Sequence, residues 1–341
     1  MAEMSRVRMG LFAAGLLLAM GRGGVAEVCT TQSQMTAADR DGLAQAAKAL
    51  AVQVQGNDAA GLHGATVAEL ARDFSAVQRV VGATAPQLAG GTLVVDQVYL
   101  LDGTQLKRGA DGKDPDAAFY CTLNRSTSEV DFLIPSLPPG RYGFAIVESR
   151  SAAPWRVSFL MRQDQGKWLM AGLYPKPMQA AGHDGLWYWT QARQMVKAKE
   201  QWNAWLYYLQ AELLLQPAGF VQSSHLEKLR TERAAAAPPT LSEGVSVDAP
   251  LVVKGADGVE YHFTKLGVDD SLEKEKIDVT AHVRVDSMGD AATARKRNAD
   301  ATSALVGAYP ELRKAFHGVW LFVDVPGQSP FATEQPMSEI H

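Results

Sequence analysis

The feature that most constrains the fold of this chain is a change in the spacing of its apolar residues at Thr92. Upstream, apolar residues recur at the spacing of one helix face; from Thr92 to Gly172 they alternate with polar residues, as in strands with one buried face. The expected strands are 93–101, 117–123, 130–134, 142–150, 155–163 and 168–172. Short turns such as 164–167 join consecutive strands, so we expect an antiparallel sheet.

Two helices precede these strands. Thr36 and Thr66 each open a capping box, and the apolar stripes that follow end near Gly56 and Gly82. Helices followed by such a meander, closing on the hairpin RVSFLMRQDQGKWLMAGLYP, resemble the nuclear-transport-factor-two-like fold over residues 36–178. The resemblance implies a strongly curved sheet with a conical cavity. It does not imply one activity, because that family includes both enzymes and ligandless assembly modules.

An open cone would offer a binding or catalytic site. The aromatic residues expected on its wall are Tyr142, Phe144, Trp155 and Trp168. The ionisable residues that could point into it are Asp96, Glu148, Asp73 and His63. An inward Asp96, flanked by Val95 and Val98, would have a raised pKa and could act as a general base. An outward, hydrated Asp96 is the simpler interpretation.

Residues 181–233 form a helical segment, in which seven aromatic residues lie within positions 187–208. The spacing A-x3-Y-x2-A at 204–211 is similar to the second helix of a tetratricopeptide repeat, which implies two helices with a turn near Lys199. A single helix over 186–216 is the alternative, because this stretch contains neither glycine nor proline. One repeat cannot bury its own faces, so the segment must dock on something else.

The aromatic surface of this segment has two possible uses. Its second half is apolar on all sides, which indicates burial between the preceding sheet and later elements. Trp187 and Trp189 lie in the more polar first half, and we expect them to be exposed and available to a partner protein or peptide. A third helix should begin near Ser224, which opens another capping box.

A second domain follows a linker rich in alanine and proline, residues 234–244. Within residues 245–326, a regularly alternating strand at 277–285 and a helix at 290–308 indicate a small α+β domain. Residues 327–341 should form a mobile tail.

The N-terminus predicts export. Arg6 and Arg8 precede a short apolar run, 9–20, and small residues follow it, as in a signal peptide over residues 1–26 that is cleaved after Ala26. The run is too short to cross a bilayer, and no later run is long enough. The mature protein should therefore be periplasmic or secreted, without a transmembrane anchor.

Two cysteines remain in the mature chain, Cys29 and Cys121. A disulfide between them is the natural pairing in an oxidising compartment. Lipid attachment at Cys29 is less consistent with Glu27 and Val28 at the two preceding positions. A buried, unpaired thiol at Cys121 is the remaining alternative.

Charge and motifs exclude several function classes. The 33 basic and 37 acidic residues leave a formal net charge of −4, so nucleic acid is not an expected partner. No residues have metal-ligand spacing, and no nucleophile elbow or nucleotide-binding motif occurs, so we expect no metal, cofactor or catalytic residue. His282 shares a strand face with Asp278 and Arg284, which could provide an acid or base but is more typical of a solvated surface.

The sequence thus predicts an α+β protein of two domains. A curved, cone-like antiparallel sheet with N-terminal helices over 27–178 is joined by a helical hairpin to a small C-terminal α+β domain. We expect an exported, non-catalytic binding or assembly protein of the bacterial cell envelope, with an envelope protein or peptide as partner. The alternative is a carrier or enzyme that holds a small apolar ligand in the cone.

Overall fold

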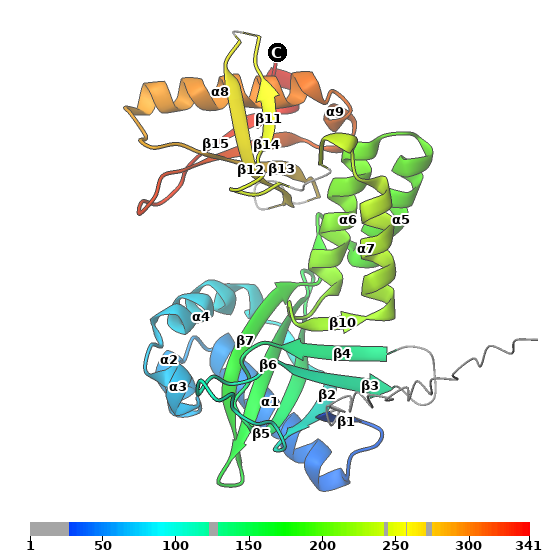
Figure 1. The fold of residues 1–341 in the computed structure, drawn as a ribbon, viewed down its shortest axis with the longest axis vertical. Helices are drawn as coiled ribbons and strands as arrows, with labels where there is room; N and C mark the ends of the chain where they lie inside the picture. The colour runs from blue at the N-terminus through cyan, green and yellow to red at the C-terminus, as the bar shows by residue number, and fades with distance from the viewer. Residues whose placement is uncertain (1–26, 123–128, 242–244, 257, 271–274) are drawn as a thin grey trace, which may run out of the picture.

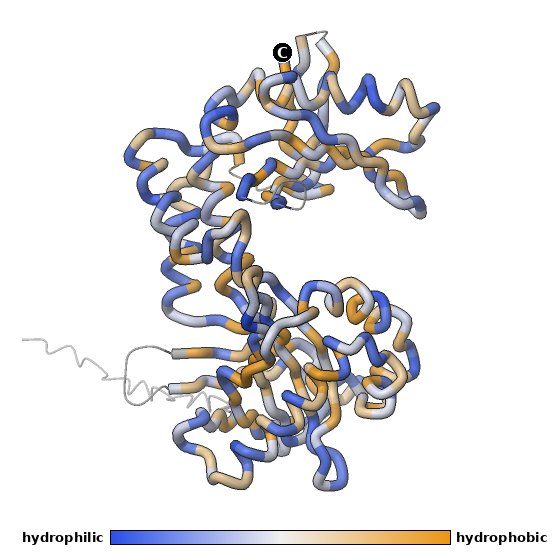
Figure 2. The backbone as a smooth tube through the Cα atoms, turned by 180° about the vertical axis from the view of Figure 1, so that it is seen from behind, coloured by the Kyte–Doolittle hydropathy of each residue, from blue (hydrophilic) through white to orange (hydrophobic). Residues whose placement is uncertain are grey.

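The computed structural model describes residues 27–341 except 123–128, 242–244, 257 and 271–274. An eight-stranded sheet with its helices lies at one end of the long axis, three helices lie in the middle, and a five-stranded sheet lies at the other end (Figure 1). Hydrophobic stretches, drawn in orange, lie in both sheets and in the helices between them (Figure 2). This mixed arrangement confirms the predicted α+β class. None of the helices in the described part is long and apolar enough to cross a membrane.

The larger sheet has the strand order β10-β4-β3-β1-β2-β5-β6-β7. Its strands are β1 (Glu27–Thr31), β2 (Thr92–Gly103), β3 (Ala117–Thr122), β4 (Glu129–Ile134), β5 (Gly140–Arg150), β6 (Trp155–Asp164), β7 (Lys167–Pro177) and β10 (Val221–Ser223). Neighbours are antiparallel except β1 and β3, which run parallel. Sequence analysis found the six long strands but missed β1 and β10, which are too short to show a period.

This sheet curls until distant strands meet. Phe132 of β4 and Phe144 of β5 are separated by four strand steps, about 19 Å in a flat sheet. Their ring centroids lie only 5.1 Å apart. The face that carries both rings is therefore the inside of a half-barrel, and we call it the inner face.

The four N-terminal helices cover the opposite face of this sheet. They are α1 (Ala37–Gln55), α2 (Ala59–Gly64), α3 (Ala68–Ala71) and α4 (Ser75–Leu88). Thr36 caps α1 as predicted, since its hydroxyl accepts a hydrogen bond from the Asp39 amide at 3.1 Å. Leu43 of α1 lies over Gly143 of β5, where an added Cβ would be 2.1 Å from a Leu43 methyl carbon. A glycine is required there for the helix to approach this closely.

The expectation that a helix begins at Thr66 is wrong. Thr66 pairs instead with Met170 of β7, where the Val67 amide donates to the Met170 carbonyl and the Met170 amide to the Ala65 carbonyl. Pairing with this strand edge replaces the first helical turn. The helical stripe therefore forms only later, as α3 and α4.

The middle of the molecule contains a helical hairpin and a third helix. Its elements are β8 (Gln179–Ala180), β9 (His183–Asp184), α5 (Gly185–Lys197), α6 (Gln201–Leu215), α7 (Ser224–Ala236) and the 3-10 turn η1 (Pro239–Leu241). Lys199 has a φ of 62°, in the left-handed region, and divides α5 from α6. The expectation of two helices with a turn near Lys199 is confirmed. Residues 234–236 belong to α7 rather than to a linker.

The smaller sheet has the order β11-β12-β13-β14-β15. The elements of this part are β11 (Leu251–Lys254), β12 (Glu260–Asp269), β13 (Asp278–Arg284), α8 (Ala291–Ala308), α9 (Leu312–Ala315), β14 (Gly318–Asp324), β15 (Phe331–Pro336) and the 3-10 turn η2 (Met337–Glu339). The expectation of a tail over 327–341 is wrong for most of its length. β15 pairs with β14 over six residues, and Met337 and Ile340 are buried.

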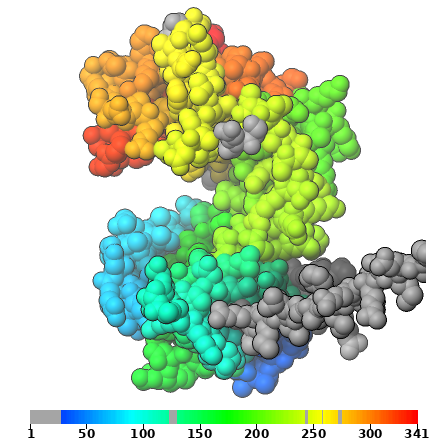
Figure 3. Space-filling model, in the orientation of Figure 1, coloured from blue at the N-terminus to red at the C-terminus, as the bar shows by residue number. Residues whose placement is uncertain are grey.

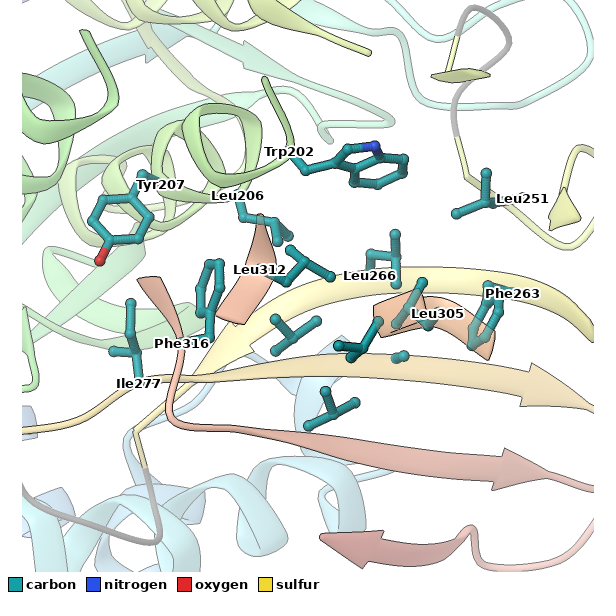
Figure 4. Packing of buried hydrophobic residues seen from close by; sticks show 14 of the residues in the cluster. Trp202, Leu206, Tyr207, Leu251, Phe263, Leu266, Ile277, Leu305, Leu312 and Phe316 are labelled. Atoms are coloured by element: carbon teal, nitrogen blue, oxygen red, sulfur yellow. The ribbon is translucent and has the colours of Figure 1, made fainter. Parts of the chain in front are cut away.

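Trp202 and Tyr207 of α6 belong to the same hydrophobic core as the smaller sheet and its helices (Figure 4). The Trp202 ring lies 4.1 Å from that of Tyr309, and the Tyr207 ring lies 5.8 Å from that of Phe316. Glu311 accepts a hydrogen bond from the Trp202 amide at 2.8 Å. The hairpin therefore docks on its own chain, as its all-round apolar character predicts. On the side away from the hairpin, an open gap separates the five-stranded sheet from α4 (Figure 3).

Candidate functional site

An apolar pocket lies between the inner face of the half-barrel and the helices above it. Its volume is about 430 Å³, within the range of small-molecule sites. We call it the junction pocket. It is lined by Tyr99, Val130, Phe132, Phe144, Ile146, Leu186, Trp189, Leu215, Pro217, Val221, Ser223, His225 and Leu226.

The strands supply the aromatic floor of the junction pocket. Tyr99 of β2 and Phe144 of β5 both contact Phe132 of β4, each with 5.1 Å between ring centroids. Below them, Phe220 contacts Phe144 at 5.6 Å and Tyr174 at 5.1 Å. The deep interior of the expected cone is therefore filled by the protein's own rings. The junction pocket lies between these rings and the start of α5.

Helix α5 supplies the wall that faces this floor, through Leu186 and Trp189. The Trp189 indole donates a hydrogen bond to the Glu232 carboxylate of α7 at 2.7 Å. Arg193 holds the same carboxylate through two hydrogen bonds of 2.7 and 2.8 Å, and its guanidinium lies 4.7 Å from the Trp189 ring centre. Glu232 thus holds the Trp189 ring at its nitrogen, and Arg193 covers its face. This wall of the pocket is therefore preformed.

The polar groups that line the pocket are few. Ser223 caps α7, since its hydroxyl accepts from the Leu226 amide at 3.2 Å, and His225 is exposed at the rim. Tyr99 is only 6% exposed and lines the pocket. Burial, reinforced by the negative charge of Asp96, raises the pKa of Tyr99, so the hydroxyl stays protonated at neutral pH.

The expected exposure of Trp187 and Trp189 is wrong. Trp189 is only 6% exposed because it faces the junction pocket. Trp187 is half-buried and stacks on His183, with 3.7 Å between ring centroids and 5° between planes. It lines a separate hollow of about 190 Å³ beside Tyr188 and Tyr207. The two tryptophans therefore do not form one open docking surface.

The four aromatic residues expected on one wall do not share a cavity. Phe144 lines the junction pocket, whereas Tyr142 is buried on the inner face and donates its hydroxyl to the Pro138 carbonyl at 2.8 Å. Trp155 and Trp168 pack on the opposite face, against the core that this face shares with the N-terminal helices. Arg141 lies 5.8 Å from the Trp168 ring centre. Alternation shows which residues of one strand share a face. Whether residues of different strands share a face depends on how the strands pair, which the sequence pattern does not give.

The expected ionisable residues lie outside the junction pocket. Asp96 is exposed at a bulge where β2 shifts its register against β5, which agrees with the hydrated alternative. His63 is exposed and lies edge-on against Phe74 at 5.0 Å. Glu148 forms an ion pair with Arg150 at 3.6 Å. None of them faces a partner that would make it a catalytic base in this pocket.

His282 has a different carboxylate partner from the one expected. Its Nδ1 lies 2.9 Å from an oxygen of Asp324 on the neighbouring strand, and its ring stacks on Phe322 at 4.7 Å. Asp278 is buried and lies 3.4 Å from His317 instead. The described residues contain no cluster of three or more metal-ligating side chains.

No known protein-family model, curated protein or solved structure matches this chain. The two family resemblances therefore stay predictions from the sequence. The function therefore has to be inferred from the geometry of the site.

Sequence reasoning missed most of the residues that line the junction pocket. Tyr99 and Phe132 lie on strands that were identified correctly, but their meeting depends on the curl of the sheet. Pro217 and Val221 follow α6 in a connection that has no sequence signal beyond its proline. The available signal was the alternation within 93–101 and 130–134, which places Tyr99 and Phe132 each on the apolar side of its own strand.

Proposed function

We propose that this protein binds a small apolar ligand in the junction pocket and performs no chemistry on it. The observation that carries this proposal is a preformed apolar pocket between Phe132, Phe144 and the fixed Trp189 ring. Apolar sites of this size, with few polar groups, are typical of small-molecule binding. The pocket lining contains no hydrogen-bonded pair of nucleophile and base, which a catalytic site would need.

The compartment belongs to the same proposal. Cys29 and Cys121 form a disulfide, with 5.2 Å between their Cα atoms. A structural disulfide is compatible with an oxidising, extracytoplasmic location, and the predicted signal peptide supports export. We therefore place the binding protein in the periplasm or outside the cell. Capture of a peptide by Trp187 and Trp189 loses its support, because these rings are covered.

Substitution of Leu186 by Asp tests the proposed site. Leu186 is 59% exposed at the rim, so a charge there should leave the fold intact while removing apolar contact with the ligand. Binding of dodecanol to the mature chain should weaken about tenfold by isothermal calorimetry, the equivalent of one partly buried leucine.

Val80→Asp is the matched control for this experiment. Val80 is an exposed apolar residue on helix α4 and does not line the junction pocket. Dodecanol should bind this variant as it binds the unmodified chain. Failure of dodecanol to bind the unmodified chain, or equal binding to both variants, would contradict the proposed site.

A further inference from the structure

A second, smaller hollow lies where the helical hairpin meets the C-terminal part of the chain. Its volume is about 190 Å³, and a cavity of ~150 Å³ is enough for a ligand of the size of benzene. It shares no lining residue with the junction pocket. We call it the Trp187 hollow, and its lining includes His183, Trp187, Tyr188, Tyr207, Glu275 and Lys276.

Three aromatic rings in the lining lie at different angles to one another. The Trp187 ring lies 5.0 Å from that of Tyr188, with 84° between their planes, and 6.2 Å from that of Tyr207, with 36°. Both tyrosines are buried, whereas Trp187 is half-buried, so its ring is the one that a ligand can reach most easily. Aromatic rings, above all the indole of tryptophan, attract cations through the negative potential of their faces.

The charges around the hollow favour a cation as well. Glu275 lines it and is exposed. Asp270 accepts a hydrogen bond from the backbone amide of a lining residue at 2.8 Å, and Asp278 lies 3.4 Å from His317, which also lines the hollow. Against these three carboxylates, the described lining contains one lysine, Lys276, and no arginine. Acidic groups therefore outnumber basic ones when the histidines are neutral.

The tyrosine hydroxyls of the hollow offer no proton to an anion. Tyr188 donates to the Ala180 carbonyl at 2.9 Å, and Tyr207 donates to the Ala315 carbonyl at 3.4 Å. Burial, with smaller effects of Tyr207 and of the negative charge of Asp270, raises the pKa of Tyr188, so its hydroxyl stays protonated at neutral pH. The same negative charge would attract a cation that is bound beside this ring.

We propose that the Trp187 hollow binds a small organic cation of the quaternary ammonium type. The methyl groups of the cation pack on the Trp187 ring, and Glu275 balances its positive charge. A methylated ammonium suits this lining because its charge is spread over methyl groups that need no hydrogen bonds. The site is separate from the junction pocket, so neither proposal depends on the other.

Choline and 3,3-dimethylbutan-1-ol test this proposal, because they have the same shape and differ in the positive charge. Their affinities for the mature chain are measured by NMR titration at one pH and one ionic strength. Choline should bind about tenfold more tightly than the alcohol, the effect of a cation that is removed from water onto an aromatic face. Trp187→Leu should remove most of this preference, because leucine has no aromatic face.

Glu275→Gln tests the charge while it keeps the shape of the side chain. Glu275 is exposed, so the fold should tolerate the change; choline should bind about threefold more weakly, and binding of the alcohol should not change. Glu260→Gln is the matched control, because Glu260 is exposed at the opposite end of β12 from Asp269 and does not line the hollow. It should leave choline binding unchanged.

Three results would overturn the proposal. They are failure of choline to bind, equal binding of choline and the alcohol, and an equal loss of choline binding in the two glutamine variants. The last result would show that choline responds to the net charge of the protein and not to Glu275 in the hollow.

Discussion

At the scale of single residues, Glu232 determines the shape of the junction pocket from outside it. One carboxylate accepts from the Trp189 indole and from two nitrogens of Arg193, and thereby joins α5 to α7. The Arg193 guanidinium is the main reason that the pKa of Glu232 lies below its usual value of 4.5. The orientation of the Trp189 ring in the pocket wall thus depends on the charged Glu232 behind it.

Substitution of Glu232 by Gln should destabilise the protein and loosen this wall. At pH 7 we expect a loss of about 1 kcal/mol in unfolding free energy, because Glu232 is partly exposed and solvent weakens the pairing. A carboxyl whose folded-state pKa is lowered stabilises the fold above 4.5, and this contribution is lost as the pH falls through the lower folded-state value.

Urea denaturation of both proteins at several pH values measures this effect. The difference in unfolding free energy should be full at pH 7 and should shrink as the pH falls below about 4.5. Equal stability of the two proteins at pH 7 would show that Glu232 does not hold Trp189. A difference that grows in acid would show that the sign of the pKa shift is wrong.

At the scale of elements, the short strand β1 connects the two parts of the larger sheet. This strand is the start of the predicted mature chain, yet it lies between β3 and β2 in the interior of the sheet. The disulfide from Cys29 to Cys121 fastens it to β3 across 92 residues of sequence. The curl that builds the pocket floor passes through β1, so the disulfide stabilises the site as well as the fold.

Replacement of both cysteines by serine should lower the unfolding free energy by about 2 to 5 kcal/mol, the usual contribution of a disulfide that closes a long loop. Guanidinium titration of the variant and of the parent protein, each with and without reductant, measures this loss. Reductant should destabilise the parent and leave the variant unchanged. A loss below about 1 kcal/mol would mean that β1 does not need the disulfide to stay in the sheet.

The periods of the sequence predicted most of the elements but not how they meet. Alternation located the six long strands and showed that Trp155 faces a core, and capping signals located α1 and α7. Three facts depend on contacts between residues far apart in the chain: the strand order, the curl that brings Phe132 to Phe144, and the pairing of His282 with Asp324. The alternation of apolar residues within one strand does not show which strands lie beside it.

At the scale of the whole molecule, the helical hairpin joins two sheets and completes the junction pocket on one of them. Trp202 and Tyr207 of α6 pack on Tyr309 and Phe316, which follow α8 and α9 in the C-terminal part, while α5 closes the junction pocket over the half-barrel. Arg156 of β6 donates to the Leu214 carbonyl at the end of α6, which fastens the hairpin to the half-barrel. Burial lowers the pKa of Arg156 to about 10, so it remains charged at neutral pH.

The most direct test of the proposed ligand site is to observe where dodecanol binds. Two-dimensional NMR of the mature chain resolves the indole signals of its seven tryptophans, which single substitutions assign. We expect dodecanol to shift the Trp189 signal, because this ring lines the junction pocket, and to leave that of Trp320 on the smaller sheet unchanged. A shift at Trp320 with Trp189 unchanged, or no shift at any tryptophan, would contradict it.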